Sequence, residues 1–189
     1  MIILSKLARV VPLVALLFTA ACATDPAERV PEPTRADWQE LSFALQALGS
    51  DVDPEEADRA ARISYEYARE LAIRWDVRDH PLVHNTKVNS GRKERGLCFQ
   101  YADAIEARLR QEDFQTLDFH RGIANGSNLL IDHSVLFLSA PGDTMFEGIV
   151  IDGWRDAGRL FWSPTLEDKR YTWVPREEVF RQRRQRQGG

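Results

Sequence analysis

Residues 95–109 read RGLCFQYADAIEARL, and this stretch decides the class of fold. Its apolar residues recur at the spacing of one helix face: Cys98, Ala102, Ile105 and Leu109. A helix is therefore predicted to begin near Cys98, shortly after a glycine. Beyond this helix the hydrophobic pattern takes the period of strands, in the segments 114–120, 131–138, 146–152, 159–163 and 170–174.

The segments before this stretch have helical character. Residues 37–48 place their apolar side chains at helical spacing. Asp53 is suited to be an N-cap and Pro54 to be the first residue of a helix, which is expected to run to about Trp75. Residues 76–96 are polar and are predicted to be irregular.

The segments after it alternate between strands and turns. Asn125-Gly126, Pro141-Gly142-Asp143 and Asp156-Ala157-Gly158 are turn signals, and Pro175 can open a last, strongly basic helix. Helices followed by an antiparallel meander predict the α+β class, with N-terminal helices packed on an antiparallel β-sheet.

Composition limits the classes of protein to which the chain can belong. Hydrophobic residues make up 43% and charged residues 29% of the 189 residues, which excludes a disordered chain and allows one domain with a substantial core. The formal net charge of −4 argues against a nucleic-acid-binding protein, because such domains are usually basic.

The first residues have the features of an export signal. Lys6 and Arg9 precede an apolar run of 11 residues from Val10 to Ala20, which is too short to span a bilayer. Small residues and then Cys22 follow this run. The pattern resembles a bacterial lipoprotein signal that is cleaved before Cys22, whose thiol then carries lipid. The alternative is an ordinary signal peptide with Cys22 incidental.

This interpretation predicts four parts of the chain and a location. Residues 1–21 would be the signal peptide, 22–36 a lipid anchor and flexible tether, 37–180 a single domain, and 181–189 a basic tail. The tail contacts anionic lipid or cell-wall polymer in one interpretation and is a solvated, frayed helix in the other. The protein would be anchored to a membrane of the cell envelope through lipidated Cys22, facing the periplasm or the cell wall.

Cys98 is a candidate nucleophile because of its position at the start of a helix. Backbone N–H groups there favour the thiolate and can bind an oxyanion that forms during acyl transfer. The candidate base is His133 and the candidate residue that orients it is Asp152. A tight turn centred between Gly142 and Asp143 would place His133 directly opposite Asp152 on neighbouring strands, with Cβ atoms ~5 Å apart.

The order of these residues resembles a known family. A Cys at a helix start in a G-x-C-x-x-Y-A setting, then a His and an Asp on successive strands, is similar to the transglutaminase-like branch of the papain-like cysteine enzymes. The resemblance covers about residues 95–155. It implies that Cys98 is the nucleophile, His133 the general base and Asp152 the His orienter. It further implies cleavage or transfer of an amide or isopeptide bond through a thioester. The predicted location at the cell wall suggests a peptide or peptidoglycan-like substrate, and we expect no cofactor or metal.

Each of these residues also has a purely structural interpretation. Cys98 can be a small core residue on an apolar helix stripe, His133 a satisfied, half-buried histidine, and Asp152 a turn former before a glycine. The alternative function is therefore a catalytically inactive envelope lipoprotein that acts as a binding or scaffold module.

Several further polar and aromatic residues have more than one interpretation. His80 and His84 are four residues apart, but the intervening Pro81 argues against a metal site. His120 closes a predicted strand or lies beside the site. The candidate oxyanion donors are Asn85, Asn89 and Gln100. Three tryptophans either line a cleft or belong to the core: Trp154, Trp162 and Trp173.

Overall fold

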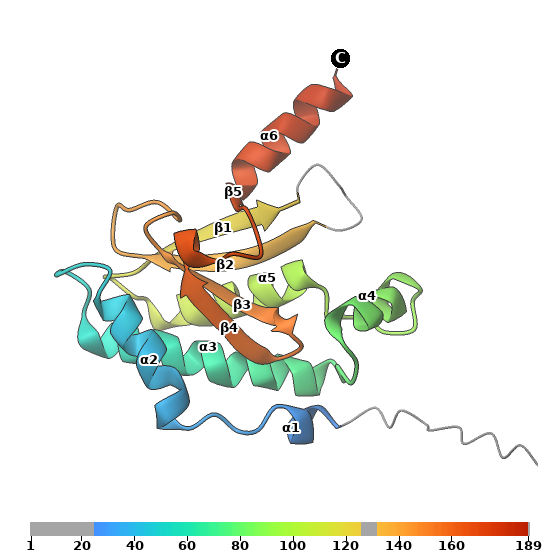
Figure 1. The fold of residues 1–189 in the computed structure, drawn as a ribbon, viewed down its shortest axis with the longest axis horizontal. Helices are drawn as coiled ribbons and strands as arrows, with labels where there is room; N and C mark the ends of the chain where they lie inside the picture. Colours follow the sequence, from blue (N-terminus) through green and yellow to red (C-terminus); the bar gives the residue numbers. More distant parts are fainter. Residues whose placement is uncertain (1–24, 126–131, 189) are drawn as a thin grey trace, which may run out of the picture.

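Six α-helices and a five-stranded sheet make up the part of the chain that the computed structural model describes, residues 25–125 and 132–188 (Figure 1). The helices are α1 (Pro26–Arg29), α2 (Arg35–Gln46), α3 (Pro54–Arg74), α4 (Pro81–Asn89), α5 (Cys98–Leu109) and α6 (Arg176–Gln187). The strands are β1 (Asp118–Ala124), β2 (His133–Ser139), β3 (Ile149–Asp156), β4 (Arg159–Pro164) and β5 (Val174–Pro175). Short 3₁₀ helices lie at Arg110–Glu112 and Thr165–Glu167.

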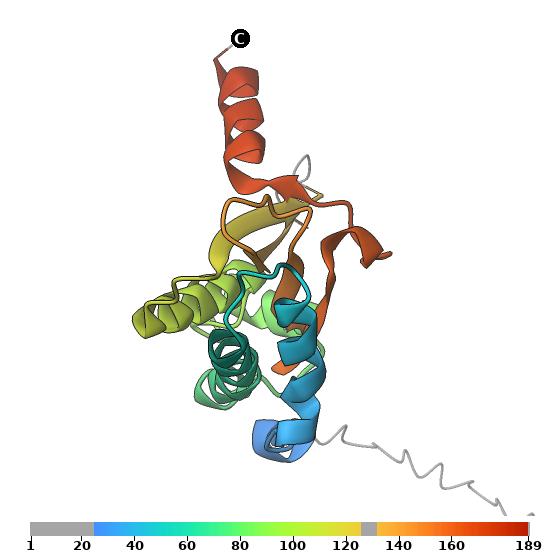
Figure 2. The same cartoon turned by 90° about the vertical axis from the view of Figure 1, so that its left-hand side faces the viewer.

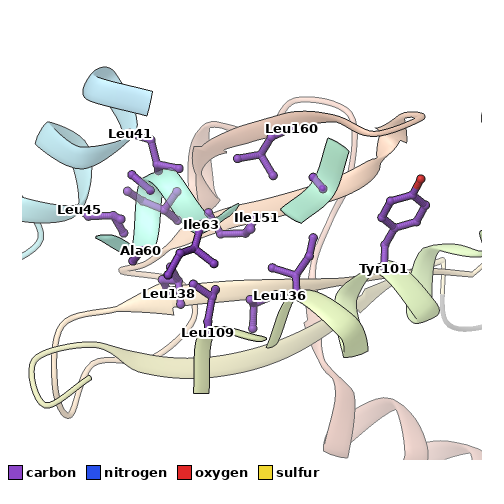
Figure 3. Close-up of a cluster of buried hydrophobic side chains, with 14 of the residues drawn as sticks. Leu41, Leu45, Ala60, Ile63, Tyr101, Leu109, Leu136, Leu138, Ile151 and Leu160 are labelled. Atoms are coloured by element: carbon purple, nitrogen blue, oxygen red, sulfur yellow. The ribbon is translucent and has the colours of Figure 1, made fainter. Parts of the chain in front are cut away.

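The strands form one antiparallel sheet in the order β4-β3-β2-β1-β5, which confirms the predicted α+β class. Helices α3 and α5 pack on the sheet, and α6 extends away from the rest of the molecule in both views (Figures 1 and 2). Side chains from α2, α3, α5 and the strands meet in one buried cluster (Figure 3). Its large members include Leu41, Leu45, Ile63, Leu109, Leu136, Leu138 and Ile151.

Helix α3 forms where the sequence predicts it. The Asp53 side chain accepts hydrogen bonds from the backbone N–H groups of Glu55 (2.8 Å) and Glu56 (2.9 Å), and Pro54 is the first helical residue. The Glu56 carboxylate also accepts hydrogen bonds from the backbone of residues 115 and 116, which follow α5. Because these residues are held in a bend, strand β1 begins at Asp118 and not at 114 as predicted.

The prediction that residues 76–96 are irregular is wrong, because α4 forms there. His80 is the N-cap, where its Nδ1 accepts a hydrogen bond from the N–H of Leu82 (3.3 Å), and Pro81 begins the helix. Histidine is not among the usual N-cap residues, and Leu82 and Val83 are exposed, so the sequence carries no apolar stripe typical of a helix.

The segment before α2 packs against the domain. The carbonyl of Val30 accepts a hydrogen bond from Nε of Arg69 (2.8 Å), and Nη1 of Arg29 donates to the carbonyl of Asp79 (2.8 Å). Val30 is buried, although the composition predicts a flexible tether as far as residue 36. The predicted signal peptide and Cys22 lie outside the described residues. Among the helices of the described part, none is long and apolar enough to cross a membrane.

Candidate active site

Cys98 is the first residue of α5, as predicted. The turn before it is fixed by Gln100, whose side-chain oxygen accepts hydrogen bonds from the N–H groups of Gly96 (2.8 Å) and Leu97 (3.0 Å). The N–H groups of Cys98 and Phe99 belong to the first turn and have no carbonyl of the helix to bond to, so they face the space beyond the helix end. The thiol donates to the carbonyl of Asp132, with 3.7 Å between sulfur and oxygen.

His133 and Asp152 come together through a register that differs from the predicted one. Leu136 pairs with Ile151 and Leu138 with Ile149, so one step further Asp152 is level with Val135 and not with His133. This register is two residues away from the prediction, because residues 140–148 form two successive turns where one tight turn was expected. A shift of two keeps every side chain on its face of the sheet. His133 Nε2 therefore still donates to Asp152 Oδ2, over 2.7 Å.

Asp152 is the centre of a buried network that also contains Arg155 and Asp168. Its Oδ1 accepts hydrogen bonds from the N–H groups of Trp154 and Arg155, both 3.0 Å. Its Oδ2 accepts from Nε of Arg155 at 3.0 Å in addition to His133. The guanidinium of Arg155 then forms two hydrogen bonds with Asp168, of 3.1 and 2.7 Å. Every oxygen of the buried Asp152 carboxylate is satisfied, which fixes the side chain that faces His133.

This network sets the protonation of His133. Burial alone would lower the pKa of His133, but the charge of Asp152 and its hydrogen bond, together with Cys98, raise it to about 9. Burial acts against the charged form of Asp152 as well, yet His133 and Arg155 keep its pKa below the usual value. The positive charge on His133 therefore stabilises the fold fully below pH 6.5, and this contribution is lost as the pH rises through 9.

The imidazole of His133 has one nitrogen directed away from Asp152. Nδ1 is buried and makes no hydrogen bond of ordinary length and angle within the described part of the chain. Cys98 lies near enough to this imidazole to contribute to the raised pKa of His133. The structure thus brings Cys98, His133 and Asp152 together, with the imidazole between the thiol and the carboxylate.

Aromatic rings enclose the same imidazole. The centroid of the His133 ring lies 4.7 Å from that of Trp154, 4.8 Å from that of Tyr171 and 5.6 Å from that of Trp173. Trp162 is not part of this enclosure, because its Nε1 donates to the hydroxyl of Tyr65 (3.0 Å) under β4. The rings shield the hydrogen bond between His133 and Asp152 from water, which strengthens it.

The remaining candidate residues hold the structure around the site. Asn85 accepts a hydrogen bond from Nε1 of Trp154 (3.0 Å), and Nε2 of His84 lies 2.8 Å from the carbonyl oxygen of Arg95. Nε2 of His120 is hydrogen-bonded to Ser139 (2.8 Å), four residues along β1 from the end that pairs with His133. Asn89 is exposed at the end of α4.

A pocket of about 430 Å³ opens beside the sulfur, and we refer to it as the Cys98 pocket. Cys98 itself is only 8% exposed, and this pocket is where its side chain borders open space. Phe99, Arg121, Asp132 and the base of α6 contribute to its walls. Ligand sites are usually concave and combine apolar walls with a few polar groups, as this pocket does.

The turn at Gly96 is expected to be sensitive to a single methyl group. Gly96 has a φ of +124°, and a Cβ there would overlap with the ring of His84. Gly96→Ala is therefore expected to reduce the free energy of unfolding by about 3 kcal/mol. Gly91→Ala is the matched control, because Gly91 has a φ of +73° and open space around it, and should cost about 1 kcal/mol. Equal losses for the two variants in urea unfolding would show that His84 does not fix this turn.

Comparison with protein-family models, curated proteins and solved structures finds no match for this chain. Within the described residues, no three side chains of His, Cys, Asp or Glu are gathered so that they could hold a metal ion. The function therefore has to be inferred from the geometry of the residues at the site.

Proposed function

We propose that the chain is a cysteine enzyme that cleaves or transfers amide bonds through a thioester. The observation that carries this proposal is the buried hydrogen bond of 2.7 Å between His133 and Asp152, next to a cysteine at a helix N-terminus. A carboxylate that holds one imidazole nitrogen leaves the other directed at the nucleophile, which is the arrangement that activates a thiol.

The reaction follows from the charges of the site. At neutral pH His133 carries a proton, since its pKa is raised to about 9, and this positive charge favours the thiolate of Cys98. The sulfur attacks the carbonyl carbon of an amide, and the N–H groups of Cys98 and Phe99 stabilise the oxyanion. The imidazolium gives its proton to the leaving nitrogen as the C–N bond breaks, which leaves a thioester on Cys98 and a neutral imidazole. Water or an amine then gives a proton to His133 and attacks the thioester, which returns the sulfur to its starting state.

A transglutaminase-like, papain-like core is the fold that we propose for this site. Supporting observations are the antiparallel sheet, the helix α5 that carries Cys98 at its start, and the successive strands that carry His133 and Asp152. The export pattern around Cys22 supports a lipoprotein of the bacterial cell envelope. A peptide or peptidoglycan-like amide is the corresponding substrate class.

Acylation by p-nitrophenyl acetate tests the proposed function without knowledge of the natural substrate. The chain carrying Cys22→Ser has Cys98 as its one remaining thiol. We expect a burst of about one nitrophenolate per chain and a hydroxylamine-sensitive acetyl group on Cys98, seen by mass spectrometry. The additional substitution Cys98→Ala should abolish both signals. If the chain with Cys98 intact showed neither the burst of nitrophenolate nor an acetyl thioester on Cys98, the result would contradict the proposal.

The second candidate function is an inactive binding or scaffold module. The observation that favours it is the burial of Cys98, which is only 8% exposed, as a structural cysteine would be. This function predicts that Cys98 in the folded chain reacts with neither p-nitrophenyl acetate nor iodoacetamide and becomes reactive after denaturation.

A further inference from the structure

The walls of the Cys98 pocket contain three arginines, two of which are neutralised by acidic partners. Arg121 is buried and forms ion pairs with Asp103 and Glu106 on α5. Its other nitrogens donate to Ser134 Oγ (3.0 Å) and to a backbone carbonyl of β2. These contacts occupy four of the five N–H donors of Arg121 and neutralise its charge, so we treat it as a wall of the pocket.

The second arginine, Arg183, lies on α6 and is also paired. Its Nη2 donates to Asp132 Oδ2 over 2.8 Å. Asp132 is the residue whose carbonyl oxygen accepts the hydrogen bond from the Cys98 thiol. This ion pair therefore ties α6 to the start of β2, beside the sulfur, and places α6 at the mouth of the pocket.

The third arginine, Arg176, differs from the other two in its charged partners. It is partly buried at the start of α6, and within the described part of the chain it makes no ion pair. Its guanidinium lies 5.8 Å from the centroid of the Phe180 ring, which holds it at the pocket wall. A guanidinium in a pocket without an acidic partner is suited to bind a carboxylate.

Apolar surface lies next to this charge. Phe99 is 47% exposed and Phe180 is 40% exposed, although both are large aromatic residues, and both line the Cys98 pocket with Ile123. Exposed aromatic rings around a concave site are typical of surfaces that bind an apolar ligand group. Phe99 follows Cys98 directly, so the apolar surface is adjacent to the nucleophile.

We infer that the Cys98 pocket binds the part of an amide substrate that carries a free carboxylate beside an apolar side chain. Arg176 would bind the carboxylate, and Phe99 and Phe180 would contact the apolar group. This inference rests on the proposed function, since it treats the pocket as the substrate site of that reaction. It narrows the substrate class from peptide-like amides in general to amides that carry a free carboxylate beside an apolar side chain.

Direct binding of two matched probes tests the inference. N-acetyl-L-phenylalanine and N-acetyl-L-phenylalaninamide have the same shape and differ in the carboxylate. In NMR titrations of the chain carrying Cys22→Ser, we expect the acid to bind about fivefold more tightly than the amide and to shift the Nε–H signal of Arg176. Arg176→Gln should make the two affinities equal. The control Arg181→Gln removes the same charge from an exposed position of α6 outside the pocket walls and should keep the preference.

The outcomes separate this inference from the proposed function. Equal binding of the two probes to the chain carrying Cys22→Ser, or a preference that survives in Arg176→Gln, would overturn the inference even if p-nitrophenyl acetate acylates Cys98. A preference that depends on Arg176 in a chain that p-nitrophenyl acetate does not acylate would support the carboxylate site and overturn the enzymatic function.

Discussion

Replacing His133 with Ala is expected to slow the alkylation of Cys98 by iodoacetamide about fivefold at pH 6.5. An ordinary thiol with a pKa of ~8.5 is only ~1% thiolate at this pH, and alkylation requires the thiolate. In the parent chain His133 is protonated at pH 6.5, because its pKa is raised to about 9, and we expect this charge to favour the thiolate form of Cys98. A thiolate stabilised in this way is also a weaker nucleophile, so the rate changes less than the thiolate population does, by about fivefold.

His120→Ala is the matched control for this measurement. His120 lies on β1 and is hydrogen-bonded to Ser139, away from the sulfur, so its loss should change the alkylation rate less than about twofold. Both variants would be compared by mass spectrometry in the background of Cys22→Ser. Equal rates for His133→Ala and the parent chain would mean that the imidazole does not act on Cys98.

Replacing Asp152 with Ala is expected to reduce the free energy of unfolding by about 3–5 kcal/mol. Asp152 is 1% exposed and accepts hydrogen bonds from His133, from Arg155 and from two backbone N–H groups. Removal of the carboxylate leaves these donors buried without their partner, and leaves the charge on Arg155 compensated only by Asp168. The loss would be measured by urea unfolding near pH 7.

Asp156→Ala provides the comparison on the same strand. Asp156 forms an ion pair with Arg159 at 3.4 Å, but both side chains are about 60% exposed, so its loss should cost less than about 1 kcal/mol. If Asp152→Ala reduced the free energy of unfolding as little as Asp156→Ala does, the network around Asp152 would not contribute to the stability of the fold as the structure indicates.

The start of α5 was predictable because local chemistry determines it. The apolar stripe that begins at Cys98 and the preceding glycine both lie within a few residues, and the structure begins the helix at Cys98. The contact between His133 and Asp152 was predictable for another reason. An error of two residues in strand register does not change which face a side chain occupies, so the contact formed although the predicted pairing was wrong.

The surroundings of the site could not be predicted, because they depend on contacts that are distant in sequence. Arg155 follows Asp152 closely, and that spacing was a signal that could have been used. Asp168, however, reaches Arg155 only because the chain after β4 returns to β3. The role of α6 in the Cys98 pocket likewise depends on the ion pair between Arg183 and Asp132, 51 residues apart.

An NMR titration of the His133 imidazole tests most directly the claim that Cys98, His133 and Asp152 form one ionic unit. Nitrogen chemical shifts report whether both ring nitrogens carry protons. In the chain carrying Cys22→Ser, we expect an imidazolium at neutral pH that loses its proton near pH 9. We expect a lower pKa of His133 after Cys98→Ser, because a serine hydroxyl cannot supply the negative charge that Cys98 contributes beside the imidazole. A His133 that titrates at or below 6.5 and does not respond to Cys98→Ser would contradict the account.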